Sequence, residues 1–425
     1  MAGVSLGGLA ERLGTPFFLL SEARLRANYG ALERGLSSAG PGAVLRYCAK
    51  TNNEAGVLEV LAACGSHLLA SHAAEVALAV RCGFPPERIA YARPVLIEAD
   101  LGAVLAAGVP LIHVHQPADV AEVEAAAARA GRRVRVSFRL RGEGGLSPLG
   151  RLNLRMGLDP GEIVEAARRC AASPWLEPAA VNFYLGTQQQ SLDGFARVFR
   201  GVLALLERLA AEGIVIGEVN LGGGIPSPSL RRVGPRDLLG RWRDRLANEA
   251  PPGRLEEFAT RLAGRFRELV AGSRLAAPPV LTAEPGRSIV GDAAVLVSTV
   301  RAVGEGWLFL DASRSHLPES PLLFARRILP LAEPGGGRRR FYNLSGSTLN
   351  TLDLLDVRRR LPPLAVGEAL AFCDAGAYSI SRAAPYAGLP PAVHMLREDG
   401  TTRLVRRAEG VDDLAGPMIF GRSDR

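Results

Sequence analysis

The sequence predicts an α/β protein in which a closed (β/α)₈ TIM-like barrel is followed by a mostly antiparallel β-domain. Two observations predict this fold. From about residue 40, short apolar β-type runs alternate with longer amphipathic stretches, as in a parallel sheet built from βαβ units. From about residue 290, strand-like runs separated by turns replace this alternation, and long helical patterns stop.

Eight strand candidates define the barrel, and the amphipathic stretches between them often end in Gly, which favours a helix C-terminus. The candidates are 44–49, 66–71, 88–92, 110–115, 134–140, 179–185, 216–221 and 279–284. Eight strand–helix units in about 250 residues are typical of a closed barrel. A doubly wound open sheet is the alternative that the pattern alone leaves open.

The β-domain is predicted from six later strand-like runs, which are 293–303, 306–312, 339–344, 368–375, 392–398 and 401–408. Residues 15–21 are also strand-like, and a helical pattern follows them at 22–36. We expect a barrel domain over 24–290 and a β-domain over 291–425, with residues 1–23 added to the β-domain.

Composition restricts the class of protein. The chain has 425 residues, a net charge of +8 and a pI near 9.7, but its arginines alternate with acids along helical stretches, so no nucleic-acid partner is expected. Five cysteines form no CxxC or metal-like pattern, which indicates reduced thiols, a cytoplasmic location and no metal site. No signal peptide is recognisable, and no apolar run reaches the ~18 residues that a membrane span needs.

The segment VLRYCAKTNN holds the only lysine of the chain, Lys50, beside 50 arginines. A lysine retained by chance would be expected on an exposed helix face, whereas Lys50 ends an apolar strand. Lysine can lose its proton and attack a carbonyl, and arginine effectively cannot. A Schiff base is the common use of such a lysine.

Three other strand ends carry unusual residues. They are Tyr184 with the following Leu-Gly-Thr, the triplet Gly222–Gly224, and the run Glu284-Pro-Gly286-Arg287. Because the carboxyl ends of barrel strands meet at one mouth, these segments and Lys50 are expected to converge there.

These segments suggest one kind of cofactor. Glycines after a strand let backbone N–H groups approach a phosphate, and Arg287 could add a charged contact. Glu284 could hold a proton on a heterocyclic nitrogen. A simple turn is the alternative interpretation of the glycine triplet, and a surface acid is the alternative interpretation of Glu284. A phosphate site, a Schiff-base lysine and this carboxylate together indicate pyridoxal 5′-phosphate.

The motifs also resemble those of the fold-type III pyridoxal phosphate-dependent decarboxylases, the family of the diaminopimelate, ornithine and arginine decarboxylases. The matching segments are YCAKTNN, NFYLGTQ, LGGGIP, AEPGRSIV and DAGAYS, in the family's order, within residues 15–385. The resemblance implies an alanine racemase/ornithine decarboxylase-like fold and a homodimer with shared active sites. It implies that Lys50 carries the cofactor as an aldimine and that Glu284 faces the pyridine nitrogen. The remaining cofactor-binding residues that it implies are Tyr184, Gly223, Gly224, Gly286, Arg287 and Tyr378.

Three positions depart from the family pattern. Tyr184 stands where the family usually has a histidine stacked on the cofactor ring. In the segment Gly346–Asp353, Leu349 replaces the cysteine that helps to protonate the product carbon, and Asn350 replaces an acid. After Asp311, Glu319 stands where diaminopimelate decarboxylases carry an arginine.

The resemblance makes Asp311, Asn350 and Asp353 candidate substrate-binding residues. Cys373, or Ser347 or Thr348 acting through water, could replace the missing thiol. The histidines His67, His72, His113 and His115 lie in no recognised motif and are expected to have core or surface roles.

The predicted function is decarboxylation of an amino acid or derivative through a Lys50 aldimine and a quinonoid intermediate. A racemase, epimerase or other α-carbon enzyme on this fold is the alternative, and a pyridoxal phosphate-binding protein that has lost catalysis is another. The identity of the substrate stays open.

Overall fold

The computed structural model describes residues 4–40, 42–142, 156–233, 254–332 and 338–418. The chain divides into two compact units. One unit comprises residues 25–228 and 253–289, and the other comprises 1–24, 229–252 and 290–425. Residues 229–233, which were predicted within the barrel, therefore group with the β-domain.

The first unit is a closed parallel barrel, so the open-sheet alternative is excluded. All eight predicted strands are confirmed, in the order β10-β2-β3-β4-β5-β6-β7-β8 around the barrel. They are β2 (Val44–Cys48), β3 (His67–Ala70), β4 (Ile89–Ala92), β5 (Leu111–Val114), β6 (Val134–Arg139), β7 (Leu176–Asn182), β8 (Glu218–Asn220) and β10 (Val280–Ala283).

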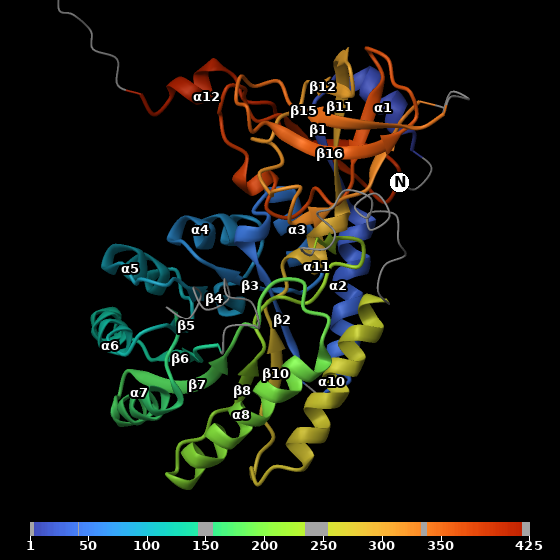
Figure 1. The fold of residues 1–425 in the computed structure, drawn as a ribbon. Coiled ribbons are helices and arrows are strands. Elements are labelled where there is room, and N and C mark those ends of the chain that lie inside the picture. The colour runs from blue at the N-terminus through green and yellow to red at the C-terminus, as the bar shows by residue number, and fades with distance from the viewer. Residues whose placement is uncertain (1–3, 41, 143–155, 234–253, 333–337, 419–425) are drawn as a thin grey trace, which may run out of the picture. The chain divides into compact units, whose positions relative to one another are not determined.

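Helices surround this barrel on its outer side (Figure 1). They are α2 (Glu22–Ser37), α3 (Ala55–Ala63), α4 (Ala73–Arg81), α5 (Glu98–Ala106), α6 (Asp119–Ala130), α7 (Pro160–Ala172), α8 (Leu192–Ala211) and α10 (Leu255–Ala271). Their ends follow from sequence: α7 starts with an Asp159–Glu162 capping box and Pro160 at its first position. Aromatic rings fix α8 against its neighbours, since Phe199 lies 5.6 Å from Phe183 and 5.0 Å from Phe266 between ring centroids.

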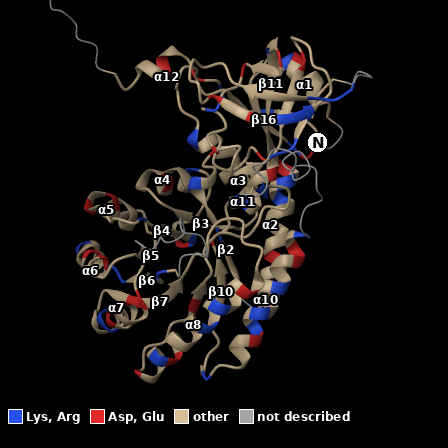
Figure 2. Ribbon diagram, viewed as in Figure 1, with Lys and Arg blue, Asp and Glu red and all other residues tan. Residues whose placement is uncertain are grey.

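Acidic and basic residues lie close together on the outer helices α7, α8 and α10 (Figure 2). Arg168 of α7 pairs with Glu212 at 2.7 Å, and Arg169 pairs with Glu124 at 3.0 Å. Arg265 and Glu268 pair along α10 at 2.9 Å. Such exposed pairs contribute little to stability, but they explain how an arginine-rich chain has solvated helix faces of mixed charge.

The barrel interior contains an ion pair where aliphatic side chains are usual. Arg46 of β2 donates two hydrogen bonds to Glu218 of β8, at 2.5 and 3.0 Å, and both side chains are buried. Thr282 Oγ1 of β10 donates to Glu218 Oε1 at 2.7 Å. Burial acts to raise the pKa of Glu218, but the Arg46 charge and these hydrogen bonds hold it below its usual range.

We expect Arg46→Met to destabilise the cofactor-free protein by about 3–5 kcal/mol, because it leaves the Glu218 charge buried without its main partner. The double variant Arg46→Met/Glu218→Met should recover most of this loss, since it removes both charges. Urea unfolding monitored by circular dichroism measures both effects. A double variant no more stable than the single one would contradict the ion-pair explanation.

The second unit centres on a sheet in which the N-terminal strand is interior. Strand β1 (Phe17–Ser21) pairs antiparallel with β11 (Ala294–Gly304) and parallel with β18 (Ala392–Leu396). The sheet order is β16-β15-β12-β11-β1-β18-β19, and β17 pairs with β11 and β14. The remaining strands are β12 (Trp307–Leu310), β14 (Ile328–Pro330), β15 (Arg340–Ser345), β16 (Leu354–Leu361), β17 (Ala369–Phe372) and β19 (Thr402–Arg406). The predicted, mostly antiparallel β-domain is confirmed.

Among the described strands of this unit, β14, β16 and the short pair of β9 (Arg231–Arg232) and β13 (Phe324–Ala325) were not predicted. Strand β16 contains the run Arg358–Arg360, which resembles an exposed charged turn, but Arg359 is buried and pairs with Asp356 at 3.1 Å. The pairing lets a charged residue occupy an inward position of the strand. Strand β9 pairs antiparallel with β13, although its sequence resembles a loop.

Candidate functional site

The four segments singled out in the sequence meet at the C-terminal end of the barrel, as predicted. Backbone hydrogen bonds continue the barrel ladder beyond the strands and join the segments in pairs. Cys48 N–H donates to Pro285 O at 3.1 Å, and Glu284 N–H donates to Gly222 O at 2.8 Å. Gln189 N–H, in the segment after Tyr184, donates to Gly224 O at 2.9 Å. Residues far apart in the sequence are thereby brought to one rim.

Lys50 lies in a single 3₁₀ turn (Ala49–Thr51) directly after β2, and it is exposed. The backbone after this turn is held in place, because the buried Tyr47 hydroxyl donates a hydrogen bond to Asn52 O at 2.8 Å. Glu75 of α4 lies close enough for its charge to interact with that of Lys50, although burial raises the pKa of Glu75. The lysine amine is therefore presented on a rigid support at the barrel rim.

Tyr184 follows β7 and leaves 38% of its surface exposed. The guanidinium carbon of Arg139 lies 5.6 Å from the centre of its ring. Tyrosine can offer a flat face to a cofactor ring, as the histidine of the resembling family does, but it carries no positive charge. Arg139 beside it supplies a cation instead.

The glycines at the rim are required by the packing of the chain itself. A Cβ on Gly224, where φ is +93°, would lie 2.2 Å from Gly186 O. A Cβ on Gly286 would lie 2.1 Å from Thr51 Oγ1, and one on Gly223 would lie 3.0 Å from Glu284 O. The glycines therefore hold the rim segments close together, and this adds to their predicted use in phosphate binding.

We expect Gly224→Ala to lower the stability of the protein by about 2–5 kcal/mol, since it combines a positive φ with overpacking. Gly217→Ala is the matched control, because a Cβ there meets no atom within 4 Å. Chemical denaturation of both variants tests this expectation. Equal midpoints for the two variants would show that the Gly224 turn relaxes without cost.

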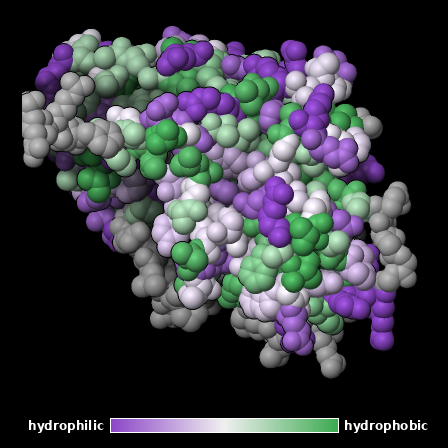
Figure 3. All heavy atoms as spheres, turned by 90° about the horizontal axis from the view of Figure 1, so that it is seen from above, coloured by the Kyte–Doolittle hydropathy of each residue, from purple (hydrophilic) through white to green (hydrophobic). Residues whose placement is uncertain are grey.

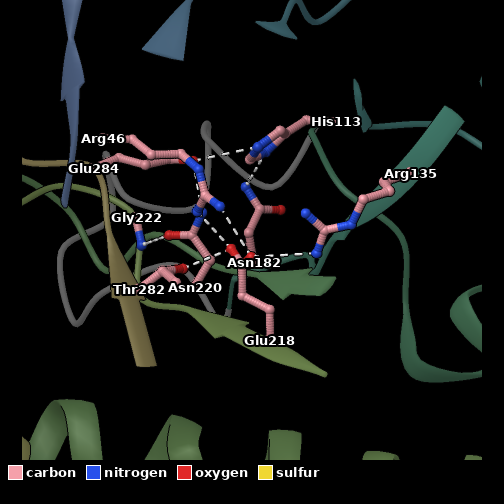
Figure 4. A network of polar contacts seen from close by, with 9 residues as sticks. All are labelled: Arg46, His113, Arg135, Asn182, Glu218, Asn220, Gly222, Thr282 and Glu284. Atoms are coloured by element: carbon pink, nitrogen blue, oxygen red, sulfur yellow. Dashed lines mark hydrogen bonds and ion pairs between the residues drawn. The ribbon is translucent and has the colours of Figure 1, made fainter. Parts of the chain in front are cut away.

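Glu284 occupies the base of this rim and is buried (Figure 4). Asn220 Nδ2 donates to Glu284 Oε1 at 2.7 Å, and Asn220 Oδ1 accepts from Gly222 N–H at 2.8 Å. Oε2 receives no hydrogen bond from the part of the chain that the structure describes. Burial raises the pKa of Glu284, and the charges of Arg46 and Arg139 together with the Asn220 hydrogen bond oppose this rise.

His113 was predicted to have a core or surface role, and it lies in the barrel core. Its side chain is fully buried on β5, but Nε2 lies 3.4 Å from Glu284 Oε1. Nδ1 lies 2.8 Å from Asn182 Nδ2, at the end of β7 (Figure 4). Sequence reasoning did not place His113, Asn182 and Asn220 around Glu284, because no motif marks them. The available signal was that each is a polar residue at the carboxyl end of an apolar strand.

The other predicted residues belong to the β-domain unit. Tyr378 is half-buried and has a φ of +55°, an uncommon value for a residue other than glycine. Both carboxylate oxygens of Asp311 are engaged: Oδ1 accepts from Ser298 Oγ at 2.7 Å, and Oδ2 accepts from Arg301 Nη2 at 2.8 Å. A direct contact of Asp311 with substrate stays a prediction, which this bonding disfavours.

Asp353 organises the loop that contains Leu349 and Asn350. It is buried, and it accepts hydrogen bonds from Arg314 N–H at 2.7 Å and from Thr348 N–H and Oγ1 at 2.9 and 2.6 Å. The exposed Asn350 borders a small pocket of about 150 Å³, which is lined by Arg314, Ser315, Pro318, Thr348, Asn350, Asp353 and Tyr386. The candidate proton donor Cys373 packs against the hydrophobic core, and burial raises its pKa to about 11.

The rim has the donor set that pyridoxal phosphate needs. Glu284 leaves Oε2 open for a ring N–H, and Lys50 is an exposed residue on the same rim. The hydroxyl of Ser227, three residues after the glycine triplet, is buried without a hydrogen-bond partner within the described ranges. An orphaned hydroxyl beside a glycine turn suits an anionic group. The residues present therefore fit the predicted cofactor.

Comparison with known proteins decides the family. Residues 31–291 match the model of the pyridoxal-dependent decarboxylases, pyridoxal binding domain. A diaminopimelate decarboxylase of Pseudomonas aeruginosa is 30% identical to the chain, over 98% of this chain and 96% of the relative. The chain belongs to the pyridoxal-dependent decarboxylases. Its cofactor is pyridoxal 5′-phosphate and its reaction is decarboxylation of an amino acid, as predicted.

Solved structures of the decarboxylase family share the fold. A diaminopimelate decarboxylase of M. jannaschii superposes with a TM-score of 0.86 at 22% identity, covering 99% of this chain and 95% of that chain. The Helicobacter pylori enzyme, complexed with L-lysine, has a TM-score of 0.82 at 22% identity and covers 96% and 98% of the two chains. The predicted barrel and β-domain are thus those of the decarboxylases.

Among the residues with assigned positions, no helix is both long and apolar enough to cross a membrane. Nor does that part of the chain contain a group of three or more His, Cys, Asp or Glu residues that could hold a metal ion.

Proposed function

We propose that Lys50 binds the carbonyl carbon of pyridoxal phosphate and that Glu284 faces its ring nitrogen. The observation that carries this assignment is the open Oε2 of the buried Glu284, on the same barrel rim as the only lysine. When bound, the cofactor supplies a protonated aromatic ring that takes up the electron pair left as the substrate's carboxylate departs. Glu284 keeps the proton at the ring nitrogen, and Tyr184 covers one face of the ring.

The phosphate end is assigned to the neighbouring turns. Gly223, Gly224 and Gly286 offer backbone next to Arg287, which is buried and positively charged. Tyr378 of the β-domain is a further candidate for this phosphate. Its positive φ supports the assignment, because strained residues are retained where the surrounding structure and the function require them.

Trapping tests the attachment. After addition of pyridoxal phosphate and borohydride reduction, we expect peptide mass spectrometry to find the cofactor on Lys50. Attachment only at the N-terminal amine would overturn the assignment of Lys50.

A homodimer is also proposed. Several large apolar side chains of the β-domain are exposed, namely Leu349 at 102%, Leu352 at 65%, Leu323 at 56% and Leu322 at 50%. Green apolar groups are interspersed with hydrophilic ones on the face seen in Figure 3. A second copy of the chain that covers these leucines would remove them from water. Light scattering of the wild type and of Leu349→Asp/Leu352→Asp tests this: a monomeric wild type contradicts the proposal.

We propose a cytoplasmic location, because all five cysteines are free thiols.

The substrate is proposed to be an α-amino acid whose distal end differs from that of diaminopimelate. The relatives are named for that compound, but here Glu319 is buried in an ion pair with Arg326 at 2.8 Å. Asp311 and Asp353 are also engaged by other groups. None of these acids is therefore open to a distal ammonium group.

Product analysis of a substrate panel in D₂O tests the reaction and the substrate together. The panel contains meso-diaminopimelate, lysine, ornithine, arginine and amino acids with anionic or apolar side chains. We expect CO₂ release with one deuteron at the α-carbon of the amine product. Deuteration without CO₂ release would contradict decarboxylation, and a preference for meso-diaminopimelate would contradict the proposed substrate class.

A further inference from the structure

The buried contact between His113 and Glu284 has no role in the proposed cofactor site so far. His113 is fully buried, its Nε2 makes no hydrogen bond within the described residues, and Glu284 Oε1 lies 3.4 Å from this nitrogen. This distance is longer than an ordinary N–H···O hydrogen bond. Contacts in cofactor-free sites are often long and tighten when the site is filled. The imidazole therefore points at the carboxylate that is assigned to the cofactor.

The protonation of His113 follows from its other neighbour. The Asn182 amide nitrogen can only donate, so Nδ1, 2.8 Å away, must accept. Burial lowers the pKa of His113 to about 3, so the ring is neutral at physiological pH and carries a single proton. That proton must lie on Nε2, which faces Glu284.

The groups around the pair are charged and come from several strands. Arg46 of β2 and Arg139 of β6 favour a negative charge on Glu284, and Glu218 of β8 opposes it. The same three charges act on His113. His115, directly after β5, is also kept neutral, since burial lowers its pKa to about 3. No other histidine charge is therefore expected beside the pair.

We propose that His113 is a positioning residue, which donates from Nε2 to Glu284 Oε1 and leaves Oε2 to the ring nitrogen of the cofactor. Asn220 donates to the same oxygen, so the two donors hold one edge of the carboxylate. They also favour its ionised form, against the cost of burial. This inference rests on the proposed role of Glu284.

Cofactor-free protein labelled with ¹⁵N-histidine provides the first test. We expect one neutral imidazole with its proton on Nε2, which is absent from spectra of His113→Gln and does not titrate between pH 5 and 8. A neutral ring with its proton on Nδ1 would overturn the proposal, because a lone pair would then face the carboxylate.

Two variants of the loaded enzyme provide the second test. His113→Gln keeps an amide donor near the position of Nε2, whereas His113→Leu removes it. We expect His113→Leu to lower kcat by about 10- to 100-fold, the range for outer partners that orient a ligating group, and His113→Gln to retain most activity. The pH at which the visible absorbance of the bound cofactor changes should move in His113→Leu and stay near the wild-type value in His113→Gln.

The matched control is His67→Gln, a half-buried histidine at the opposite end of the barrel, which should match the wild type in both measurements. If Glu284→Gln impairs catalysis and His113→Leu does not, the inference fails and the role of Glu284 stands. If neither variant impairs catalysis, the role of Glu284 fails as well.

Discussion

Lys50→Ala and Lys50→Arg are both expected to lower kcat by roughly 10⁴- to 10⁶-fold, the scale on which removal of a covalent catalytic group acts. Arginine keeps the positive charge and nearly the length of lysine, but it does not lose its proton and cannot attack a carbonyl. The comparison therefore separates nucleophilic chemistry from charge. CO₂ release from the best substrate of the panel measures the loss.

Two properties of Lys50 separate a loss of catalysis in its variants from a loss of folding or from labelling elsewhere. Because Lys50 is exposed, its replacement should change the free energy of unfolding by less than about 0.5 kcal/mol. Because the chain has no second lysine, borohydride should fix the cofactor on no other side-chain amine. A Lys50→Arg variant within tenfold of wild-type kcat would show that the amine is not the attacking group.

The barrel could be predicted because local pattern determines it. Its eight strands are short apolar runs, and the carboxyl end of each one is fixed by its place in the chain, so Lys50, the glycine triplet and Glu284 could be placed on one rim. Strand β16 could not be predicted, because its inward Arg359 is charged, and Asp356 balances that charge in the interior. That compensation depends on packing which the local pattern does not encode.

The contacts around Glu284 also could not be predicted from the local sequence pattern. Its role could be inferred from its position at the end of β10, but the donors to it lie on β5 and β8, and neither belongs to a motif. Asp311 and Asp353 show the reverse case. They occupy positions that suggest substrate binding, yet each carboxylate is already engaged by neighbouring donors. A sequence gives the position of an acid along the chain, whereas its availability depends on the donors that surround it.

Glu284→Gln is expected to lower kcat by about 10²- to 10³-fold, as the removal of one preorganised electrostatic group does. The amide has the shape of the carboxylate, but it cannot balance a proton on the ring nitrogen. CO₂ release measures this loss. Glu305→Gln, which changes an exposed acid, is the control and should match the wild type.

Glu284→Gln should lower kcat, but it should raise the stability of the cofactor-free protein at alkaline pH. Burial raises the pKa of Glu284 above its unfolded value, so the folded state binds this proton more tightly than the unfolded state does. The contribution of Glu284 to stability therefore falls as pH rises from the unfolded pKa, about 4.3, toward the raised folded pKa. Glu284→Gln should be more stable than the wild type at pH 8, and this advantage should disappear below about pH 4. Urea midpoints at the two pH values test it. A variant that is less stable at pH 8 would mean that the carboxylate supports the fold, whereas a more stable one would show that the barrel retains a destabilising acid because the reaction needs it.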